Sequence, residues 1–211
     1  MPRVEASAEV PVDAAVSFAV SQTYGEVRYR WDPFVREQHL LGGATRAAKG
    51  VRTATTSRHR LKMVSEYVSF RPPSQVGMKM VEGPWFFESF SGGWSFRPLD
   101  ASTTAATWRY TFSVRPPWLA PVADPIGRWL LGRDIRRRIA AFARACADPE
   151  ILGAGRRPPR RRDRRRQRTT AGLNLGSSVR AMAGRRSWRR VSGALALGVM
   201  ATDVVDGPRM S

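Results

Sequence analysis

Residues 84–114 constrain the fold more than any other part of the chain, because apolar and polar side chains alternate there in two stretches. In the second stretch Trp108, Tyr110 and Phe112 share one parity. Successive side chains of a strand point to opposite faces of a sheet. A short turn at 98–102 separates the two stretches. The pattern therefore predicts an antiparallel pair of strands with one face formed by large aromatic rings.

The first of these stretches places an acid in an aromatic row. Phe86, Glu88 and Phe90 share one parity. A carboxyl group surrounded by rings would be desolvated, and desolvation favours its protonated form. We predict that Glu88 faces a cavity as a general acid or base. The alternative is an ordinary aromatic core in which a bulge at Gly92-Gly93 turns Glu88 outward.

The rest of the first half predicts further strands and two short helices. Residues 4–10 alternate as a strand does, and residues 12–21 have one apolar helical face. Asp32-Pro33, an acid followed by proline, predicts the start of a second short helix. Strand-like runs joined by short turns fill residues 39–82. Short turns join antiparallel strands, so we expect a strongly twisted antiparallel sheet.

A long amphipathic helix is predicted over residues 125–147. Its apolar stripe includes Leu131, Ile135 and Ile139, while the arginines of residues 133–138 are expected on the opposite, solvated face. A stripe of this length must pack on a surface of matching size. The aromatic face of the sheet is the only candidate, and sheet and helix would together enclose a cavity.

Two polar side chains join Glu88 as catalytic candidates. His59 shares its parity with Leu61, and Tyr110 presents a phenol on the inner face that could bind a carbonyl group. Both also fit plain core or rim positions. The side chains predicted to line the cavity are large, apolar or aromatic: Trp31, Met78, Met80, Phe86, Phe90, Trp94, Trp108, Phe112, Ile135 and Ile139.

Several other chemistries lack support in the sequence. Two histidines and one cysteine, far apart, predict no metal site, and no glycine pattern predicts a phosphate-binding cofactor site. Cys146 falls in the apolar row of the last helix and is expected to be an inert buried thiol. A single cysteine favours a cytoplasmic location. The apolar run at 194–202 is far shorter than the roughly 20 residues that span a bilayer, so no transmembrane segment is predicted.

Positive charge is concentrated at the end of the chain. The formal charge is +19, of which residues 1–152 contribute +7 and residues 153–211 contribute +12. Nine arginines fall between positions 156 and 168: Arg156, Arg157, Arg160, Arg161, Arg162, Arg164, Arg165, Arg166 and Arg168. Such a run repels itself and buries nothing, so we expect a folded domain over 1–152 and a disordered basic tail over 153–211. The tail either binds polyanions without reading sequence or is a solvated segment without a partner.

The order of these elements resembles the START-like (SRPBCC) superfamily, within it the polyketide cyclase/dehydrase group. The segments that carry the likeness are residues 4–21, Trp31-Asp32-Pro33, Gly50, Glu66, Pro72-Pro73, residues 93–98, Thr107-Trp108 and the final helix. The resemblance implies an α+β helix-grip fold, in which a curved antiparallel sheet of about seven strands wraps around the C-terminal helix over a deep apolar pocket. No set of catalytic residues from the family can be matched to positions in this sequence.

Two function hypotheses follow, because this fold hosts both enzymes and binders. The first is a cytoplasmic protein that binds a hydrophobic or aromatic small molecule, such as a polyketide or lipid. If it is an enzyme, the resemblance implies cyclisation or dehydration by acid–base chemistry. The second is a non-enzymatic interaction protein that its Arg-rich tail tethers to nucleic acid or an anionic membrane. Neither hypothesis fixes the ligand or the oligomeric state.

Overall fold

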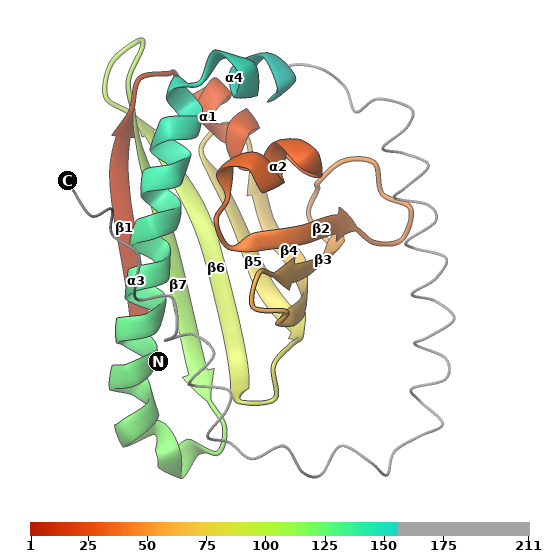
Figure 1. The fold of residues 1–211 in the computed structure, drawn as a ribbon, viewed down its shortest axis with the longest axis vertical. Coiled ribbons are helices and arrows are strands. Elements are labelled where there is room, and N and C mark those ends of the chain that lie inside the picture. The colour runs from red at the N-terminus through yellow and green to blue at the C-terminus, as the bar shows by residue number, and fades with distance from the viewer. Residues whose placement is uncertain (156–211) are drawn as a thin grey trace, which may run out of the picture. The chain divides into compact units, whose positions relative to one another are not determined.

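The computed structural model describes residues 1–155, which form one antiparallel sheet packed against helices. In chain order the elements are β1 (Arg3–Val10), α1 (Ala14–Ser21), α2 (Glu26–Trp31), β2 (Val35–Leu40), β3 (Arg52–Ser57), β4 (Lys62–Arg71), β5 (Gln75–Glu82), β6 (Phe87–Pro98), β7 (Thr104–Val114), the 3-10 helix η1 (Pro117–Leu119), α3 (Ala120–Ala147) and α4 (Pro149–Gly155). The predicted α+β helix-grip architecture is confirmed (Figure 1).

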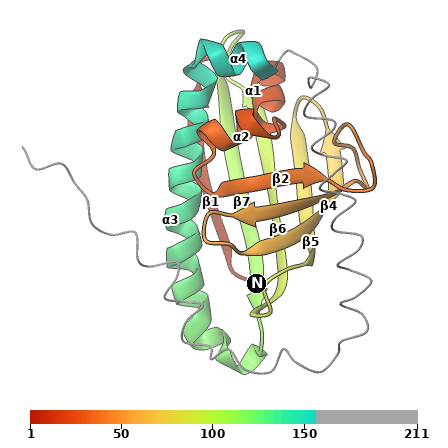
Figure 2. The ribbon, with the colours of Figure 1, turned by 45° about the vertical axis from the view of Figure 1, so that its right-hand side comes forward.

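The seven strands lie in the spatial order β1-β7-β6-β5-β4-β3-β2, and all neighbours are antiparallel. Consecutive strands from β2 to β7 pair with one another, while β1 pairs with β7. The sheet curls so strongly that β2 crosses β6 and β7 at a steep angle (Figure 2). Strand twist accumulates across a sheet, and here it produces a concave face.

The aromatic face predicted for β6 and β7 is confirmed. Trp94 pairs with Trp108 and Phe90 pairs with Phe112 across the two strands. The ring centres of Trp94 and Trp108 lie 4.2 Å apart. Cross-strand aromatic pairs of this kind stabilise a sheet beyond the apolar area that they bury.

Helix α3 packs along β1 and β7, as Figure 1 shows. Phe142 of α3 is fully buried, and its ring centre lies 4.5 Å from that of Trp94 and 5.6 Å from that of Trp31. The expected packing of the last helix on the aromatic face is therefore confirmed. Cys146 is also fully buried, and burial raises the pKa of its thiol to about 12, which keeps it unreactive at neutral pH.

The prediction that a helix starts at Asp32 is wrong, because α2 ends there. The backbone N–H of Asp32 donates to the carbonyl of Arg28 at 2.9 Å and closes the last turn of α2. Pro33 follows, and a proline disfavours helical backbone at the residue before it. The Asp32 side chain is thus free to bind groups outside its own helix.

Some predictions from the sequence concern residues that the structure does not describe. Residues 153–155 of the predicted tail belong to α4, which corrects its start. The rest of the tail, with the nine arginines between positions 156 and 168, lies outside the described residues. Within residues 1–155, no helix combines the length and apolar character that a membrane crossing requires.

Candidate functional site

A cavity of about 110 Å³ lies on the concave side of the sheet. Its walls come from β2 to β7, from the segments between α1 and α2 and between α2 and β2, and from one residue each of α1, α2 and α3. An apolar cavity of roughly 150 Å³ in another protein holds one benzene molecule. The free space here therefore holds about a single ring, and because the cavity is partly open to solvent, the rest of a larger guest would extend out of it.

Five of the predicted apolar residues line this cavity: Met78, Met80, Phe90, Trp94 and Trp108. They come from three neighbouring strands, β5, β6 and β7. Aromatic rings and flexible thioethers form a wall that adapts to an apolar guest.

The other five predicted residues pack away from the cavity. Trp31, Phe112, Ile135 and Ile139 are buried in the core and do not reach the free space. Phe86 is only half-buried and packs against the Trp85 and Phe87 rings, 6.0 and 4.7 Å between centres. These side chains support the walls, so the prediction that they line the cavity is wrong.

The prediction that Glu88 faces the cavity is also wrong. Glu88 is exposed, because the register between β6 and β7 shifts between Phe87 and Ser89. A bulge places two residues opposite one, and this changes which side chains face inward. Phe87 therefore packs on Phe112, with 6.1 Å between ring centres, and the carboxylate points away. Glu88 is not placed to act on a guest in the cavity.

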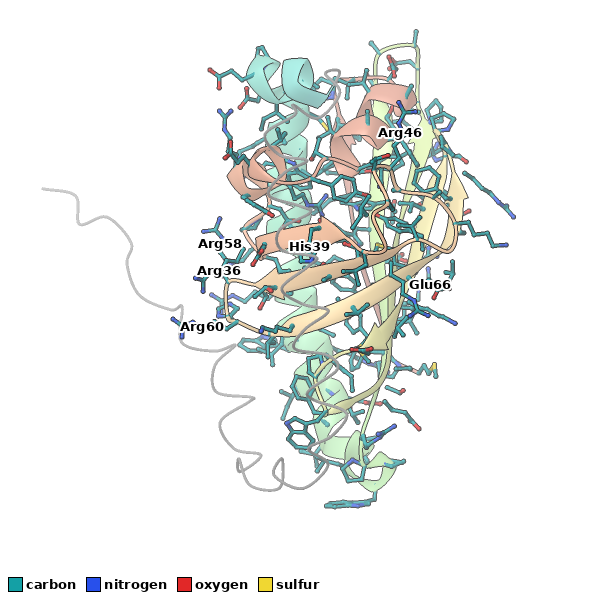
Figure 3. The ribbon with its side chains drawn as sticks, turned by 90° about the vertical axis from the view of Figure 1, so that its right-hand side faces the viewer. Arg36, His39, Arg46, Arg58, Arg60 and Glu66 are labelled. Carbon is teal, nitrogen blue, oxygen red and sulfur yellow. The ribbon has the colours of Figure 1, made fainter. Side chains whose placement is uncertain are left out.

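His59 does not face the cavity either. Strand β3 ends at Ser57, so His59 lies in the turn before β4 and its strand parity no longer applies. Its neighbours Arg58 and Arg60 are exposed at the outer edge of the molecule (Figure 3). Arg60 has a φ of 62°, which marks a tight turn.

Tyr110 is the one catalytic candidate that lines the cavity. Its hydroxyl oxygen accepts a hydrogen bond from Nη1 of Arg138, and the whole residue is buried. Burial raises the pKa of Tyr110 above its usual range despite the neighbouring guanidinium. The phenol therefore stays protonated at neutral pH and offers its hydrogen as a donor.

A buried ion network lies next to Tyr110 and joins three elements. Asp32 accepts bonds from Arg138, Nε to Oδ1 at 3.1 Å and Nη2 to Oδ2 at 2.8 Å. Nη2 of Arg28 lies 2.7 Å from Oδ2 of the same carboxylate. Burial alone would raise the pKa of Asp32, but Arg138 and Arg28 hold it down, to about 2. The carboxylate is therefore ionised at neutral pH.

Arg28 and Arg138 both line the cavity, and neither is among the site residues predicted from the sequence. The arginines of residues 133–138 were expected in solvent, which is wrong for Arg138 because only 6% of its surface is exposed. A signal was present. Arg138 lies seven residues after Leu131 and three after Ile135, so it occupies a position of the apolar stripe.

The remaining polar wall consists of hydroxyl and amide groups. The hydroxyls of Tyr24 and Tyr67 lie 2.6 Å apart. Burial raises the pKa of both phenols above their usual range. Among the residues that line the cavity, all of them in the described part of the chain, there is no aspartate or glutamate. The wall is thus rich in hydrogen-bond donors for guest oxygen atoms and has no carboxylate base.

The family assignment comes from the first 147 residues. A family model described as polyketide cyclase / dehydrase and lipid transport matches residues 1–147. The chain belongs to this family. The resemblance inferred from the sequence is therefore confirmed, and the family's ligand chemistry agrees with a cavity behind an aromatic wall. No curated protein matches the sequence.

Solved structures share the fold of this polyketide cyclase/dehydrase-family chain at low sequence identity. A START superfamily protein from Mycobacterium smegmatis has a TM-score of 0.59 and 15% identity, over 70% of this chain and 98% of its own. The protein XoxI from Bacillus cereus has a TM-score of 0.57 and 14% identity, over 71% and 99%. A point mutant of norcoclaurine synthase from Thalictrum, in complex with a transition-state analogue, has a TM-score of 0.51 and 11% identity, over 69% and 93%. At these identities the likeness concerns the fold alone.

Proposed function

We propose that this protein binds a hydrophobic small molecule with oxygen functions, of the polyketide or lipid class, in the cavity of its curled sheet. The observation that carries the proposal is the cavity itself, whose wall divides into two chemically different parts. Rings and thioethers form one part, and guanidinium, phenol and amide groups form the other. Ligand sites are typically apolar pockets with a few convergent polar groups.

Each part of the wall has a separate role. Met78, Trp94 and Trp108 remove the apolar body of the guest from water, which supplies most of the affinity. Tyr110, Arg138 and Arg28 hold its oxygen atoms and so fix its orientation. A point mutant of norcoclaurine synthase, which shares this fold, is in complex with a transition-state analogue, and this supports the binding of a small molecule by the fold here.

Turnover of the guest is a second candidate function, and one contact favours it. Arg138 donates to the Tyr110 hydroxyl, so the phenol can donate its own hydrogen to a carbonyl oxygen. Charge that develops on this oxygen during cyclisation or dehydration would be stabilised by the pair. With Glu88 outside, no carboxylate base supplements it. Tyr110→Phe should then reduce turnover more than it reduces binding.

Native mass spectrometry of the full chain, purified from its own host, tests the proposed binding. The wild type should carry a small molecule that leaves on mild activation. Ser65→Leu fills the cavity, because Ser65 is buried in its wall, and should abolish the adduct. Ser95→Leu is the matched control, since Ser95 is exposed and lies next to the cavity-lining Trp94 on β6.

Met78→Trp is a second cavity-filling variant, in case Ser65→Leu disturbs folding. Circular dichroism shows which variants keep the wild-type fold. An adduct that survives in both folded cavity variants would contradict the proposal. So would a wild type that carries no adduct and binds none of a panel of aromatic and aliphatic probes.

A further inference from the structure

Arg28 has donors that the protein itself does not use. Its Nη1 donates to the backbone carbonyl of Ser21 at 2.7 Å, and its Nη2 pairs with Asp32. Its Nε is buried and has no hydrogen-bond partner. A buried guanidinium N–H without an acceptor is costly, so the position of Arg28 in the cavity wall calls for an acceptor from outside the chain.

Charge in this region is also unbalanced. Arg28 and Arg138 are 5% and 6% exposed, and they share one fully buried carboxylate, Asp32. Both oxygens of that carboxylate accept hydrogen bonds from Arg138, and Oδ2 also lies 2.7 Å from Nη2 of Arg28, so one negative charge is shared by two cations. Asp134 lies 3.9 Å from Nη1 of Arg138, but its side chain is partly exposed and it does not contact Arg28. Burial lowers the pKa of Arg28 below its usual value, because Asp32 only partly offsets the loss of water.

We propose that the guest carries an anionic oxygen, as in a carboxylate or an enolate, and that Arg28 binds it. This inference rests on the proposed function, since it names the chemical class of the guest in the same cavity. An oxyanion gives the free Nε–H an acceptor and balances the second buried cation. Hydrogen bonds between a guanidinium and an anionic oxygen are about twice as strong as neutral ones.

The surroundings of Arg28 fit an aromatic or unsaturated acid. The guanidinium carbon of Arg28 lies 4.2 Å from the ring centre of Trp31 and 5.9 Å from that of Trp108. That of Arg138 lies 3.9 Å from the Trp108 ring. Trp108, a ring of the apolar wall, thus lies close to both cations. A guest with its acid group at Arg28 extends its body along Trp108 and Trp94, which both line the cavity.

One further group refines the guest's chemistry. Oε1 of Gln22 is buried, lines the same cavity and accepts no hydrogen bond. The amide nitrogen of Gln22 already donates to Ser21 Oγ at 2.9 Å. An acceptor and a donor that both lack partners in one cavity suit a guest that carries a hydroxyl group as well as its acid group.

Matched probe pairs test the inference by isothermal titration calorimetry on the full chain at pH 7. The pairs are benzoate and benzamide, 3-phenylpropanoate and its amide, 2-naphthoate and its amide, and decanoate and its amide. Each pair keeps the size of the probe and changes its charge. We expect the best-binding acid to bind at least about tenfold more tightly than its amide, equivalent to about 1.4 kcal/mol.

The variant that decides is Arg28→Met, which removes the cation and leaves Asp32 paired with Arg138. It should bring the acid-to-amide affinity ratio to about one, because it weakens the binding of the acid much more than the binding of the amide. Arg30→Met is the matched control, because Arg30 is an exposed arginine of the same helix. It should keep the wild-type ratio. If Arg28→Met does not fold, Arg28→Lys serves instead, and a ratio lowered at least about threefold supports the inference.

The outcomes separate this inference from the proposed function. Equal binding of acids and amides by the wild type would overturn the inference that the guest is an anion and leave the cavity proposal intact. A ratio that Arg28→Met or Arg28→Lys leaves unchanged would do the same. Failure of every acid and every amide to bind the wild type would overturn both.

Discussion

At the scale of single residues, Asp32 holds the polar part of the cavity together. It caps no helix start, but it anchors arginines from α2 and α3 at distances of 2.7 to 3.1 Å. The sequence predicts that Asp32 begins a helix, and it does not show which cations approach it in space. Arg28 stands four residues before Asp32 and Arg138 stands 106 residues after it. Only the first of these pairings could be read from spacing along the chain.

Asp32→Asn should destabilise the protein at pH 7 by about 3 to 5 kcal/mol, because it leaves two buried guanidinium groups without their shared anion. The pKa of Asp32 is lower in the folded state than in the unfolded state, where it is near the usual value of 3.8. Its stabilisation is therefore present above about pH 4 and is lost as the pH falls towards about 2.

Urea unfolding of wild type and Asp32→Asn at several pH values between 7 and 2 checks this prediction. The difference in the free energy of unfolding should narrow steadily below about pH 4. Glu88→Gln is the control, because Glu88 is exposed and should change this free energy by less than about 0.5 kcal/mol. A difference that is independent of pH would contradict the account of Asp32.

At the scale of elements, α3 has two parts with different surroundings. Its second half packs on the aromatic sheet through Phe142, while its first half presents Val122 and Trp129 to solvent, 62% and 57% exposed. Phe142→Ala should cost about 3 to 5 kcal/mol, because it leaves a hole among Trp31, Trp94 and Phe96.

Trp129→Ala removes an even larger ring from the same helix and should cost less than about 0.5 kcal/mol. Thermal and urea unfolding of both variants measure the contrast. Similar losses in the two variants would show that the exposed half of α3 contributes to the core, which the packing described above does not allow.

The helices and strands themselves are largely predictable from the sequence. Which side chains of β6 and α3 face inward is less predictable. Alternation in β7 correctly placed Trp108 and Tyr110 inward. The same alternation misplaced Glu88, because the bulge lies between Phe87 and Ser89, where no glycine indicates it, and not at Gly92-Gly93. Arg138 was predicted in solvent because its burial depends on a carboxylate that is far away in the sequence, Asp32. The apolar stripe of the helix does not reveal that partner.

At the scale of the whole molecule, the cavity and the basic segment are separate features of one chain. The first 147 residues carry the family match, and the nine arginines between positions 156 and 168 follow it. Polyanion binding by these arginines stays a prediction. Glutamine in place of all nine arginines should strongly lower retention on a heparin column. Each arginine that binds heparin releases one counterion, and each substitution removes that contribution to binding.

The same nine-fold variant should bind 2-naphthoate with an affinity within about twofold of the wild type. Heparin retention that the substitutions leave unchanged would remove the polyanion role. A large loss of naphthoate affinity would contradict the assignment of ligand binding to the folded domain.

One measurement tests directly whether a guest occupies the space between the aromatic sheet and the buried arginines. The chain has seven methionines, of which Met63, Met78 and Met80 line the cavity. Met1 is 85% exposed, precedes β1 and does not line the cavity. Methyl-labelled methionine gives each of them a signal in NMR spectra of the full chain.

On titration with 2-naphthoate, the account predicts saturable shifts of the Met63, Met78 and Met80 methyl signals and no shift of Met1. All three signals should follow one binding curve, and Ser65→Leu should abolish the shifts. If the three cavity methyl signals stay fixed while naphthoate binds, the guest lies elsewhere and the cavity is not the binding site.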